Sequence, residues 1–490
     1  MNTLRVLRGW SGLLLYAVTT LTMSACAVGP DFVKPPPPQG AGYSSTPPIV
    51  ATASADGAAQ RFEPGKAVAE QWWTQFRSAP IDAMVRKALT DSPTLLSAEA
   101  KLRQSQDNLR AGYGVFFPQI GIDLGRTRER SAPTLQGSAA PGNIFNVVTA
   151  GASISYALDV FGGQRRMVEG LRAQTDVQSE AVKAAHLALA ANVVNAGIAR
   201  AAYVTEIRQT EELIALENEQ LVATEAQVAA GTSAYAGVLT LRGQIAGNRA
   251  ALAAMHQKAD QAAHLLAMLQ GVTPAQVVIP NMELDGISLP ADLPVSLPSE
   301  LVRRRPDILA AEARMHAASA DIGVATAAMF PSFVLSGTYG AAGSGLNSLG
   351  GESGRFWSVG PSLSVPLFHG GSLWYGRKAA IDAFQAAEAD YRQTVLVAFD
   401  QVADSLKALE HDAETLQAQS DALHAAEQSL QLLRASYLGG MAPYLDVLAV
   451  DVQLHQARIG YLDAQAQRLQ DTVALYAALG GGWQAAKDGP

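Results

Sequence analysis

The sequence predicts a mixed α and β membrane protein in which each chain supplies long helices and a few strands to a larger assembly. Three observations support this prediction. Much of the 490-residue chain repeats itself, each copy holds a long segment without proline, and each copy holds two short segments of alternating character. Alternation of apolar with small or polar residues indicates a strand with two different faces, whereas long proline-free segments indicate helices.

The N-terminus has the features of a cleaved signal. Two arginines precede a mostly apolar run from Leu13 to Met23, and small residues lead to Cys26, the single cysteine of the chain. We predict a signal peptide at residues 1–25 rather than a membrane span. The Met-Ser-Ala-Cys end resembles a bacterial lipobox, so Cys26 is the expected lipid attachment site. The alternative is a cysteine that merely ends the apolar run. Ala27 follows it, which in bacterial lipoproteins favours sorting to the outer membrane.

Proline-rich stretches divide the rest of the chain. Residues 26–79 are expected to form a lipidated, extended N-terminal arm, with no core over residues 27–70, and residues 271–298 are expected to form a linker. Two copies of one unit, 80–270 and 299–480, lie on either side of the linker, and a tail follows at 481–490. The copies are recognised by residues that recur 209 positions later in the chain, namely Leu221, Gly231, Tyr235, Val238, Gln244 and Arg249.

Each copy contains two candidate strands. Apolar and small residues alternate after Pro118 and again after Pro331, and also in the segments that end near Phe161 and Leu367. One face is apolar and the other is small or polar, which is the pattern of a membrane β-barrel. The edge of a two-sheet sandwich would look similar. Residues 128–144 and 341–355 are rich in glycine, serine and alanine and are expected to be loops at the strand tips.

The helices predicted for each copy are long. Residues 164–230 and 372–438 lack proline, and each would form one helix of about 100 Å. Shorter helices would add to a similar length if stacked, and they are predicted at 80–112, 237–270, 299–327 and 446–479. Heptad spacing of Ile214, Leu221 and Val228 predicts side-by-side coiled-coil packing.

Four strands per chain are too few for a closed barrel, since known single-chain barrels begin at about eight. An open sheet edge in lipid leaves backbone groups unpaired, at several kcal/mol each. Several chains must therefore pool their strands. Two chains would give a barrel filled by its own side chains, whereas three would give twelve strands and an aqueous pore.

Several motifs make the chain similar to the outer membrane factors, the TolC-like and OprM-like channels, and especially to NodT-type efflux lipoproteins. These motifs are VGPDFVKP after Cys26, WWTQF at Trp72, YALDVFGGQRR at Tyr156, LPSELVRRRPDI at Leu297, GPSLSVPLFHGG at Gly360 and LYAALGGGW at Leu475. The resemblance implies a homotrimer with a shared 12-stranded β-barrel in the outer membrane of a Gram-negative bacterium. A long α-helical coiled-coil barrel would then extend into the periplasm.

The same resemblance implies a function. The chain would be the passive exit duct of a tripartite efflux or export system, carrying small molecules such as drugs or toxic organics. Its partners would be a periplasmic adaptor, an inner-membrane transporter and outer-membrane lipid. The alternative function is a periplasmic coiled-coil structural lipoprotein, although such a rod would not need the strand segments.

The resemblance also places two helix-to-helix turns at the periplasmic tip, where the family contacts its adaptor and closes its gate. Gly231 and Gly440 suit left-handed C-caps of the preceding helices. Tyr235 and Tyr444 follow them in the two turns. These four residues are the expected adaptor contacts.

The expected gate residues are Leu445, Asp446 and Asp451. A leucine ring would exclude water, and acidic rings would favour cations. The sequence departs here from the family pattern, because Ala449 and Val452 stand where aspartate and arginine are usual. The alternative interpretation of both aspartates is that they are ordinary solvated carboxylates.

No enzymatic site is expected. The eight histidines are scattered, and the chain contains no His-Glu-x-x-His, Walker or Gly-x-Ser-x-Gly motif. We therefore expect no catalytic residue, metal or cofactor. The net charge of −8 does not favour a nucleic-acid partner. Arg-rich motifs at Gly162 and Arg303 are expected to be architectural, since each lies where a helix begins.

Overall fold

The computed structural model describes residues 27–36, 42–43, 50–55, 59–130 and 142–481. The predicted signal peptide, Cys26 and tail residues 482–490 lie outside this range. The chain divides into two compact units. Unit 1 comprises Met1–Pro35, Leu102–Gln178 and Ala311–Tyr391, and unit 2 comprises Pro36–Lys101, Ser179–Ala310 and Arg392–Pro490. Each unit draws on both sequence repeats.

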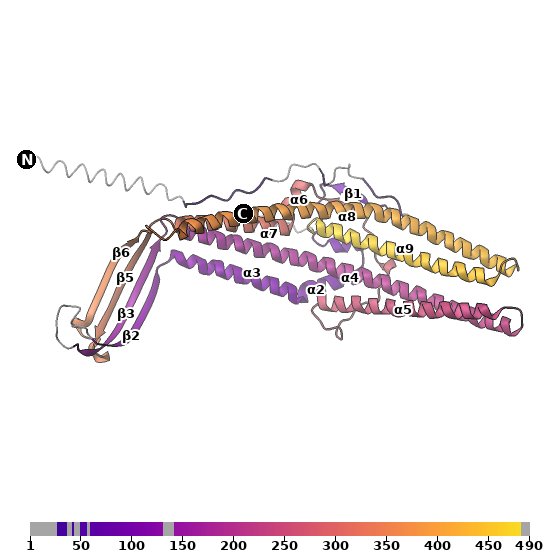
Figure 1. Ribbon diagram of the computed structural model, residues 1–490, viewed down its shortest axis with the longest axis horizontal. Helices are drawn as coiled ribbons and strands as arrows, with labels where there is room; N and C mark the ends of the chain where they lie inside the picture. The colour runs from indigo at the N-terminus through magenta and orange to yellow at the C-terminus, as the bar shows by residue number, and fades with distance from the viewer. Residues whose placement is uncertain (1–26, 37–41, 44–49, 56–58, 131–141, 482–490) are drawn as a thin grey trace, which may run out of the picture. The chain divides into compact units, whose positions relative to one another are not determined.

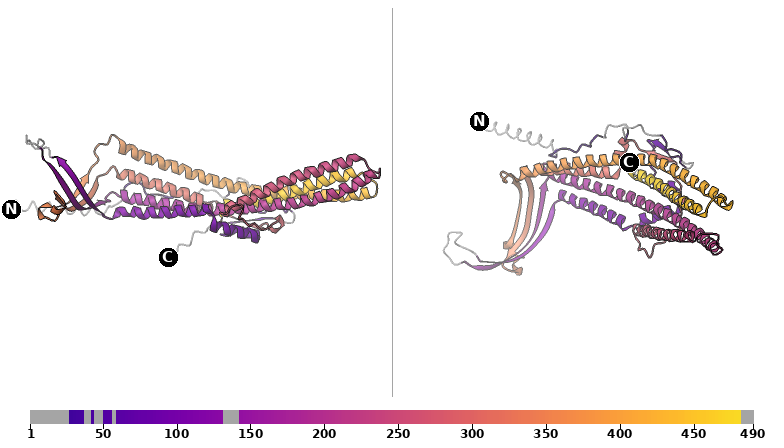
Figure 2. Two further views of the ribbon diagram at one scale, coloured as in Figure 1. Left: turned by 90° about the horizontal axis from the view of Figure 1, so that it is seen from below. Right: turned by 45° about the vertical axis from the view of Figure 1, so that its right-hand side comes forward.

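Unit 1 contains an antiparallel sheet whose described strands follow the order β2-β3-β5-β6. These strands are β2 (Gln119–Arg130), β3 (Ile144–Leu158), β5 (Ser332–Gly343) and β6 (Arg355–Ser364). They lie side by side in a curved sheet (Figures 1 and 2). The predicted strand segments are confirmed, and the strands reach further into the expected tip loops than the sequence indicated.

Helices α4 (Gly163–Ala229) and α8 (Ser372–Leu438) have 67 residues each. They confirm the two long helices predicted from the absence of proline. Among the described helices, α4 contains a window apolar enough to cross a membrane by length and composition, and 56% of that window is buried. Such burial is typical of a helix that packs against protein.

In unit 2, α5 (Tyr235–Leu269) and α9 (Tyr444–Ala478) follow the two long helices. The turn from α4 to α5 and the turn from α8 to α9 lie at the same end of the paired helices (Figure 2). Ile214 and Leu221 of α4 pack against a buried cluster of Leu241, Ile245 and Leu448. These contacts confirm the coiled-coil packing predicted for this stretch of α4.

The shorter predicted helices at 80–112 and 299–327 are wrong as continuous elements. The first is broken into α2 (Ala79–Asp91) and α3 (Pro93–Gly112). The second is broken into α6 (Pro298–Arg304) and α7 (Pro306–Ala327). Each break falls just before a proline, because proline disfavours helical geometry in the residue that precedes it.

The expectation that the arm has no core is wrong for part of its length. Residues 61–64 form β1 (Arg61–Pro64), which pairs in parallel with β4 (Asp292–Val295) of the predicted linker. Phe62 and Val68 are buried, as are Trp72 and Phe76 of the following 3-10 helix η1 (Trp72–Phe76). Isolated strands of four residues have no periodic signal, so their pairing depends on contacts that the local sequence does not show.

Candidate functional site

The sheet of unit 1 has two chemically different faces. Its register places Ile122 opposite Ala152, Ala152 opposite Tyr339, and Tyr339 opposite Trp357, so one row on one face crosses all four strands. The neighbouring row on the other face is made of small or polar residues: Gly121, Ser153, Thr338 and Ser358. Ile122 is 78% exposed and Trp357 is 75% exposed in the single chain. One face therefore suits lipid and the other suits water.

The two edges of this sheet are β2 and β6. β2 runs from the helical end of the sheet to the strand tips, and β6 runs in the opposite direction. An edge strand carries a row of backbone groups without ladder partners. Because the two edges run in opposite directions, β2 of one copy can pair with β6 of another in an antiparallel ladder.

Both predicted glycine caps are present in unit 2. Gly231 and Gly440 have φ values of +73° and +72°. After each helix, the glycine N–H and the next N–H donate to carbonyl groups of the last turn, with N···O distances of 2.9 and 2.9 Å at Gly231 and 2.9 and 2.8 Å at Gly440. These are Schellman motifs, which turn the chain sharply between paired helices.

Aromatic side chains lie close to the second turn. The ring of Tyr444 lies 5.2 Å from that of Tyr437, and Gln227 of α4 donates a hydrogen bond of 3.1 Å to the Tyr437 hydroxyl. Burial and the nearby Asp451 raise the pKa of Tyr444 to about 12. Tyr235, in contrast, is 55% exposed. The two tyrosines at equivalent positions of the repeat thus have different environments.

The three predicted gate residues are placed differently from one another. Asp446 is exposed in the first turn of α9. Asp451 is only 6% exposed and lies 3.4 Å from Arg434 of α8. Burial raises the pKa of Asp451, although the neighbouring arginines oppose the shift. Leu445 belongs to α9, and its side chain is outside what the structure describes.

In unit 1 the first described residues bind the helices near the sheet. The Val28 N–H donates to the Phe161 carbonyl at 3.0 Å, between the end of β3 and the start of α4. Arg166, which is 5% exposed, donates to Asp31 at 2.6 Å and to Glu169 at 2.8 Å. Its neighbour Arg165 pairs with Asp159 at 3.2 Å. These contacts are consistent with the architectural role expected for the motif at Gly162.

His316 of α7 also contacts the arm, beside Arg166 and Glu169. The His316 ring stacks on Phe32 at 4.4 Å and lies 2.9 Å from Glu169. Burial would raise the pKa of Glu169, but hydrogen bonds from His316 and Arg166 hold that pKa below its ordinary value. Sequence reasoning missed Glu169 and His316, because nothing in the local pattern of either helix indicates a docked arm.

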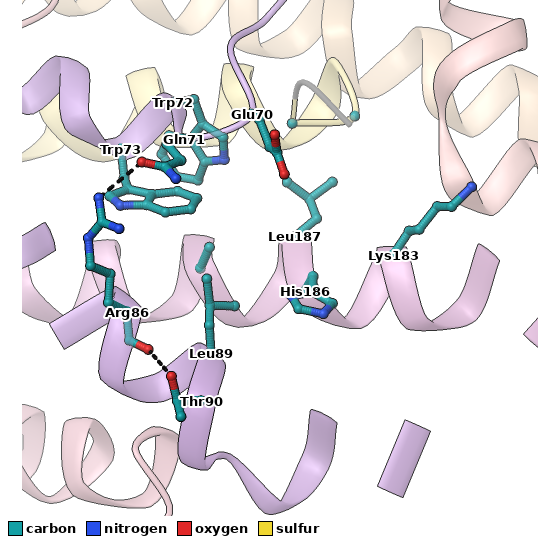
Figure 3. Close-up of a pocket in the computed structure, with 13 residues that line it drawn as sticks. Glu70, Gln71, Trp72, Trp73, Arg86, Leu89, Thr90, Lys183, His186 and Leu187 are labelled. Atoms are coloured by element: carbon teal, nitrogen blue, oxygen red, sulfur yellow. Dashed lines mark hydrogen bonds between the residues drawn. The ribbon is translucent and has the colours of Figure 1, made fainter. Parts of the chain in front are cut away.

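Unit 2 also contains a cavity of about 520 Å³ (Figure 3). Trp72 and Trp73 line it, together with Arg86, Lys183 and His186. Arg86 donates to Gln71 at 3.0 Å, and Lys183 donates to Glu180 at 2.6 Å. Within the described residues, no group of three or more His, Cys, Asp or Glu side chains could hold a metal ion. Arg86 and Lys183 of the cavity are thus each engaged in a polar contact within unit 2.

Comparison with known proteins agrees with this geometry. Residues 84–272 and 297–481 match the family model described as outer membrane efflux protein. The toluene efflux pump outer membrane protein TtgC of Pseudomonas putida is 30% identical over 478 residues, which cover 96% of each chain. The cation efflux system protein CusC of Escherichia coli is 28% identical, over 96% of this chain and 99% of CusC.

A solved structure has the same architecture. The outer-membrane channel OprN superposes with a TM-score of 0.84 at 28% identity, covering 94% of this chain and 100% of OprN. Together the matches extend over both repeats and both compact units.

Proposed function

Because this chain belongs to the outer membrane efflux protein family, we propose that three copies of it close into one duct through the outer membrane. Members of the family are the outer-membrane channels of tripartite efflux pumps, with an adaptor and an inner-membrane transporter. This chain is accordingly an outer-membrane exit channel that extends into the periplasm, and it is not an enzyme.

The observation that carries the trimer proposal is the two-faced sheet with two open edges. Edge-to-edge pairing of three copies gives a ring of twelve strands, with the Ile122 row facing lipid and the Ser153 row facing the lumen. Closure satisfies every edge group, which the hydrocarbon core of a bilayer requires. Twelve strands also leave space for a water-filled passage, unlike eight.

The lipid anchor at Cys26 is part of the proposal. The neighbouring arm is bound at Val28, next to the end of β3, so an acyl chain on Cys26 would begin beside the proposed membrane strands. Palmitate labelling should mark the wild type but not Cys26→Ser. Equal labelling of both proteins would remove this part of the proposal, while trimer formation tests the barrel separately.

We assign adaptor contact to the two tip turns. Gly231 and Gly440 shape them, and Tyr235 is the exposed aromatic of the first turn. Leu438 and Met441 of the second turn are 85% and 80% exposed, and they would add apolar surface to such a contact. The ring contact between Tyr444 of α9 and Tyr437 of α8 joins the two helices on either side of the second turn.

The gate is proposed at the start of α9, with Leu445 and Asp446 at the constriction. Asp451 would act by holding α9 against Arg434 of α8. Asp446→Asn should reduce cation selectivity, since an acidic ring attracts cations, and Leu445→Ala should raise conductance.

Single-channel recording in planar bilayers tests the function. The wild type should form a nearly closed channel with small, cation-selective conductance, and adaptor binding should shift it towards the open state. Asp463→Asn, an exposed change further along α9, is the matched control and should leave selectivity unchanged. Absence of any channel activity in trimeric protein would contradict the duct, whereas wild-type conductance in both gate variants would move the constriction elsewhere on the tip.

Cargo choice is assigned to the partner pump. The relatives include a toluene efflux pump outer membrane protein, a cation efflux system protein and a pyoverdine export outer membrane protein. Similar channels thus serve chemically unrelated cargo. We propose that this chain is a passive conduit for small molecules.

A further inference from the structure

One face of β2 changes its chemistry part-way along the strand. Ile120, Ile122 and Leu124 are 75%, 78% and 79% exposed and face the same side as the apolar rows of the sheet. Alternate residues of a strand share a face. The next three residues on this lipid side are therefore all arginines and all exposed: Arg126, Arg128 and Arg130.

The charge of this arginine row is not balanced locally. Arg126 lies opposite Val148, Arg128 opposite Asn146 and Arg130 opposite Ile144. Glu129 lies on the same strand but projects from the other face. Within the described residues, none of the three guanidinium groups forms an ion pair. The row thus presents three positive charges to whatever surrounds the strand tip.

The repeat shows that the fold does not need these arginines. The offset that aligns Pro118 with Pro331 aligns the arginine row with β5, where the equivalent residues are Tyr339, Ala341 and Gly343. β5 pairs with β6 in an antiparallel ladder, as β2 does with β3, and has no basic residue at any of the three positions. The arginine row is therefore a feature of the edge strand β2 and not of the repeat.

A fourth arginine belongs to the same face. Arg355 begins β6 at the tip end of the sheet and lies opposite Ala341, which shares the face of Tyr339. If three copies close as proposed above, on which this inference rests, β6 of one copy lies beside β2 of the next. Each of the three seams would then carry Arg355 together with the arginine row.

Membrane energetics place the row at an interface. Arginine on the lipid face of a barrel is costly at the bilayer midplane and costs little near the headgroups. The apolar band along β2 must therefore end between Leu124 and Arg126. Alternate residues lie about 6.8 Å apart, so the row spans about 14 Å of the outer rim.

We propose that the arginine row binds the phosphate groups of lipid A, the phosphorylated glycolipid of the outer leaflet, and so fixes the height of the barrel in the membrane. Guanidinium groups bind phosphate oxygens in pairs of parallel hydrogen bonds. The strand tips face the cell exterior in this arrangement, so the row meets that leaflet. The arginine row follows the apolar residues Ile120 to Leu124 on the same face of β2. A lipid that carries both acyl chains and phosphate groups can contact both parts of this face.

The test is native mass spectrometry of the full-length, lipidated protein in detergent, with diphosphoryl lipid A, monophosphoryl lipid A or phosphatidylethanolamine added. The wild type should retain diphosphoryl lipid A most strongly. The combined Arg126→Gln, Arg128→Gln and Arg130→Gln variant should bind it about tenfold or more weakly, because each basic residue near an anionic surface adds to the attraction. The corresponding three-lysine variant should retain part of the binding.

Asp123→Asn is the matched control, since Asp123 lies on the same strand but on the opposite face. It should bind lipid A like the wild type. Equal binding by the wild type and the three-glutamine variant would overturn the inference, as would a wild type that does not prefer diphosphoryl lipid A. The same spectra report the number of chains. A trimer without lipid A preference rejects only this inference, whereas a monomer rejects the duct itself.

Discussion

Buried arginines join segments that are far apart in this chain. Arg166 holds the arm to α4. Arg305, which is 7% exposed, binds Asp307 of α7 and Gln401 of α8. Arg468 of α9 is 1% exposed and donates to Gln60 and Thr52 at 3.1 Å each. A buried guanidinium is stable only with such partners. These three residues are therefore the positions where single changes should affect stability most through lost polar contacts.

Arg166→Gln should destabilise arm docking. The change leaves Glu169 without one of its donors and removes the pair with Asp31, and loss of hydrogen bonds to charged groups costs about 2 kcal/mol. The purified protein should melt at a lower temperature, and a protease should cut more readily between residues 27 and 36. Lys34→Gln is the control, because Lys34 is 74% exposed in its pair with Glu312. An unchanged cleavage pattern in Arg166→Gln would show that the arm is held elsewhere.

Glu206 of α4 predicts a pH dependence of stability. It is 5% exposed, and burial together with Asp463 raises its pKa from 4.5 to about 7. Folding thus favours the neutral acid. Its stabilising contribution is full below pH 4.5 and is lost as the pH rises through about 7.

Glu206→Gln imitates the neutral acid at every pH. The variant should match the wild type at acidic pH and exceed its stability at pH values above 7, by at most about 3 kcal/mol. Melting temperatures measured across this pH range check the sign. If the two proteins differed in melting temperature by the same amount at both ends of the range, the raised pKa of Glu206 would be contradicted.

At the scale of elements, uninterrupted patterns were predictable and paired contacts were not. The absence of proline located α4 and α8 to within about one residue at each end, and alternation located the four strands of the sheet. The pairing of Arg61 with Asp292 in β1 and β4 depends on two segments 231 residues apart. No local pattern carries that information.

The candidate site likewise has features that the sequence predicts and features that it does not. Gly231 and Gly440 could be predicted as caps, because a left-handed turn after a helix selects glycine. The burial of Asp451 beside Arg434 could not be predicted, since it depends on how α9 is rotated against α8. A change of one position along a helix turns a side chain by about 100°.

The two tip glycines provide a test at this scale. Gly231→Ala and Gly440→Ala should each destabilise the tip by about 1 kcal/mol, because their positive φ disfavours a Cβ atom. Apart from the adjoining residues, no heavy atom of the described chain lies within 4 Å of the added carbon at either position, so the cost is conformational. Hydrogen exchange at the ends of the paired helices should become faster.

Gly243→Ala is the matched control. Gly243 lies inside α5, and an added Cβ there meets no described atom within 4 Å beyond its neighbours and the backbone of its own helix. Alanine should stabilise the helix there by about 1 kcal/mol. If all three variants changed exchange in the same direction, the left-handed caps would not be the cause.

At the scale of the whole molecule, a single chain leaves much apolar surface and two strand edges without partners. In the proposed assembly, lipid covers the exposed apolar face of the sheet, and neighbouring copies pair with its two edges. Outer-membrane location and efflux function follow from the family. Three-fold closure is our proposal, and it rests on four strands per chain, the need to pair every edge and the space that a water-filled passage requires.

The most direct test of this account is the mass of the purified complex in detergent. Native mass spectrometry of the full chain, expressed with its own N-terminus, should give three chains of 51.4 kDa each, less the signal peptide and plus attached lipid. The complex should insert into bilayers and conduct ions. A monomer that inserts stably and conducts would contradict the closure of the barrel by three copies.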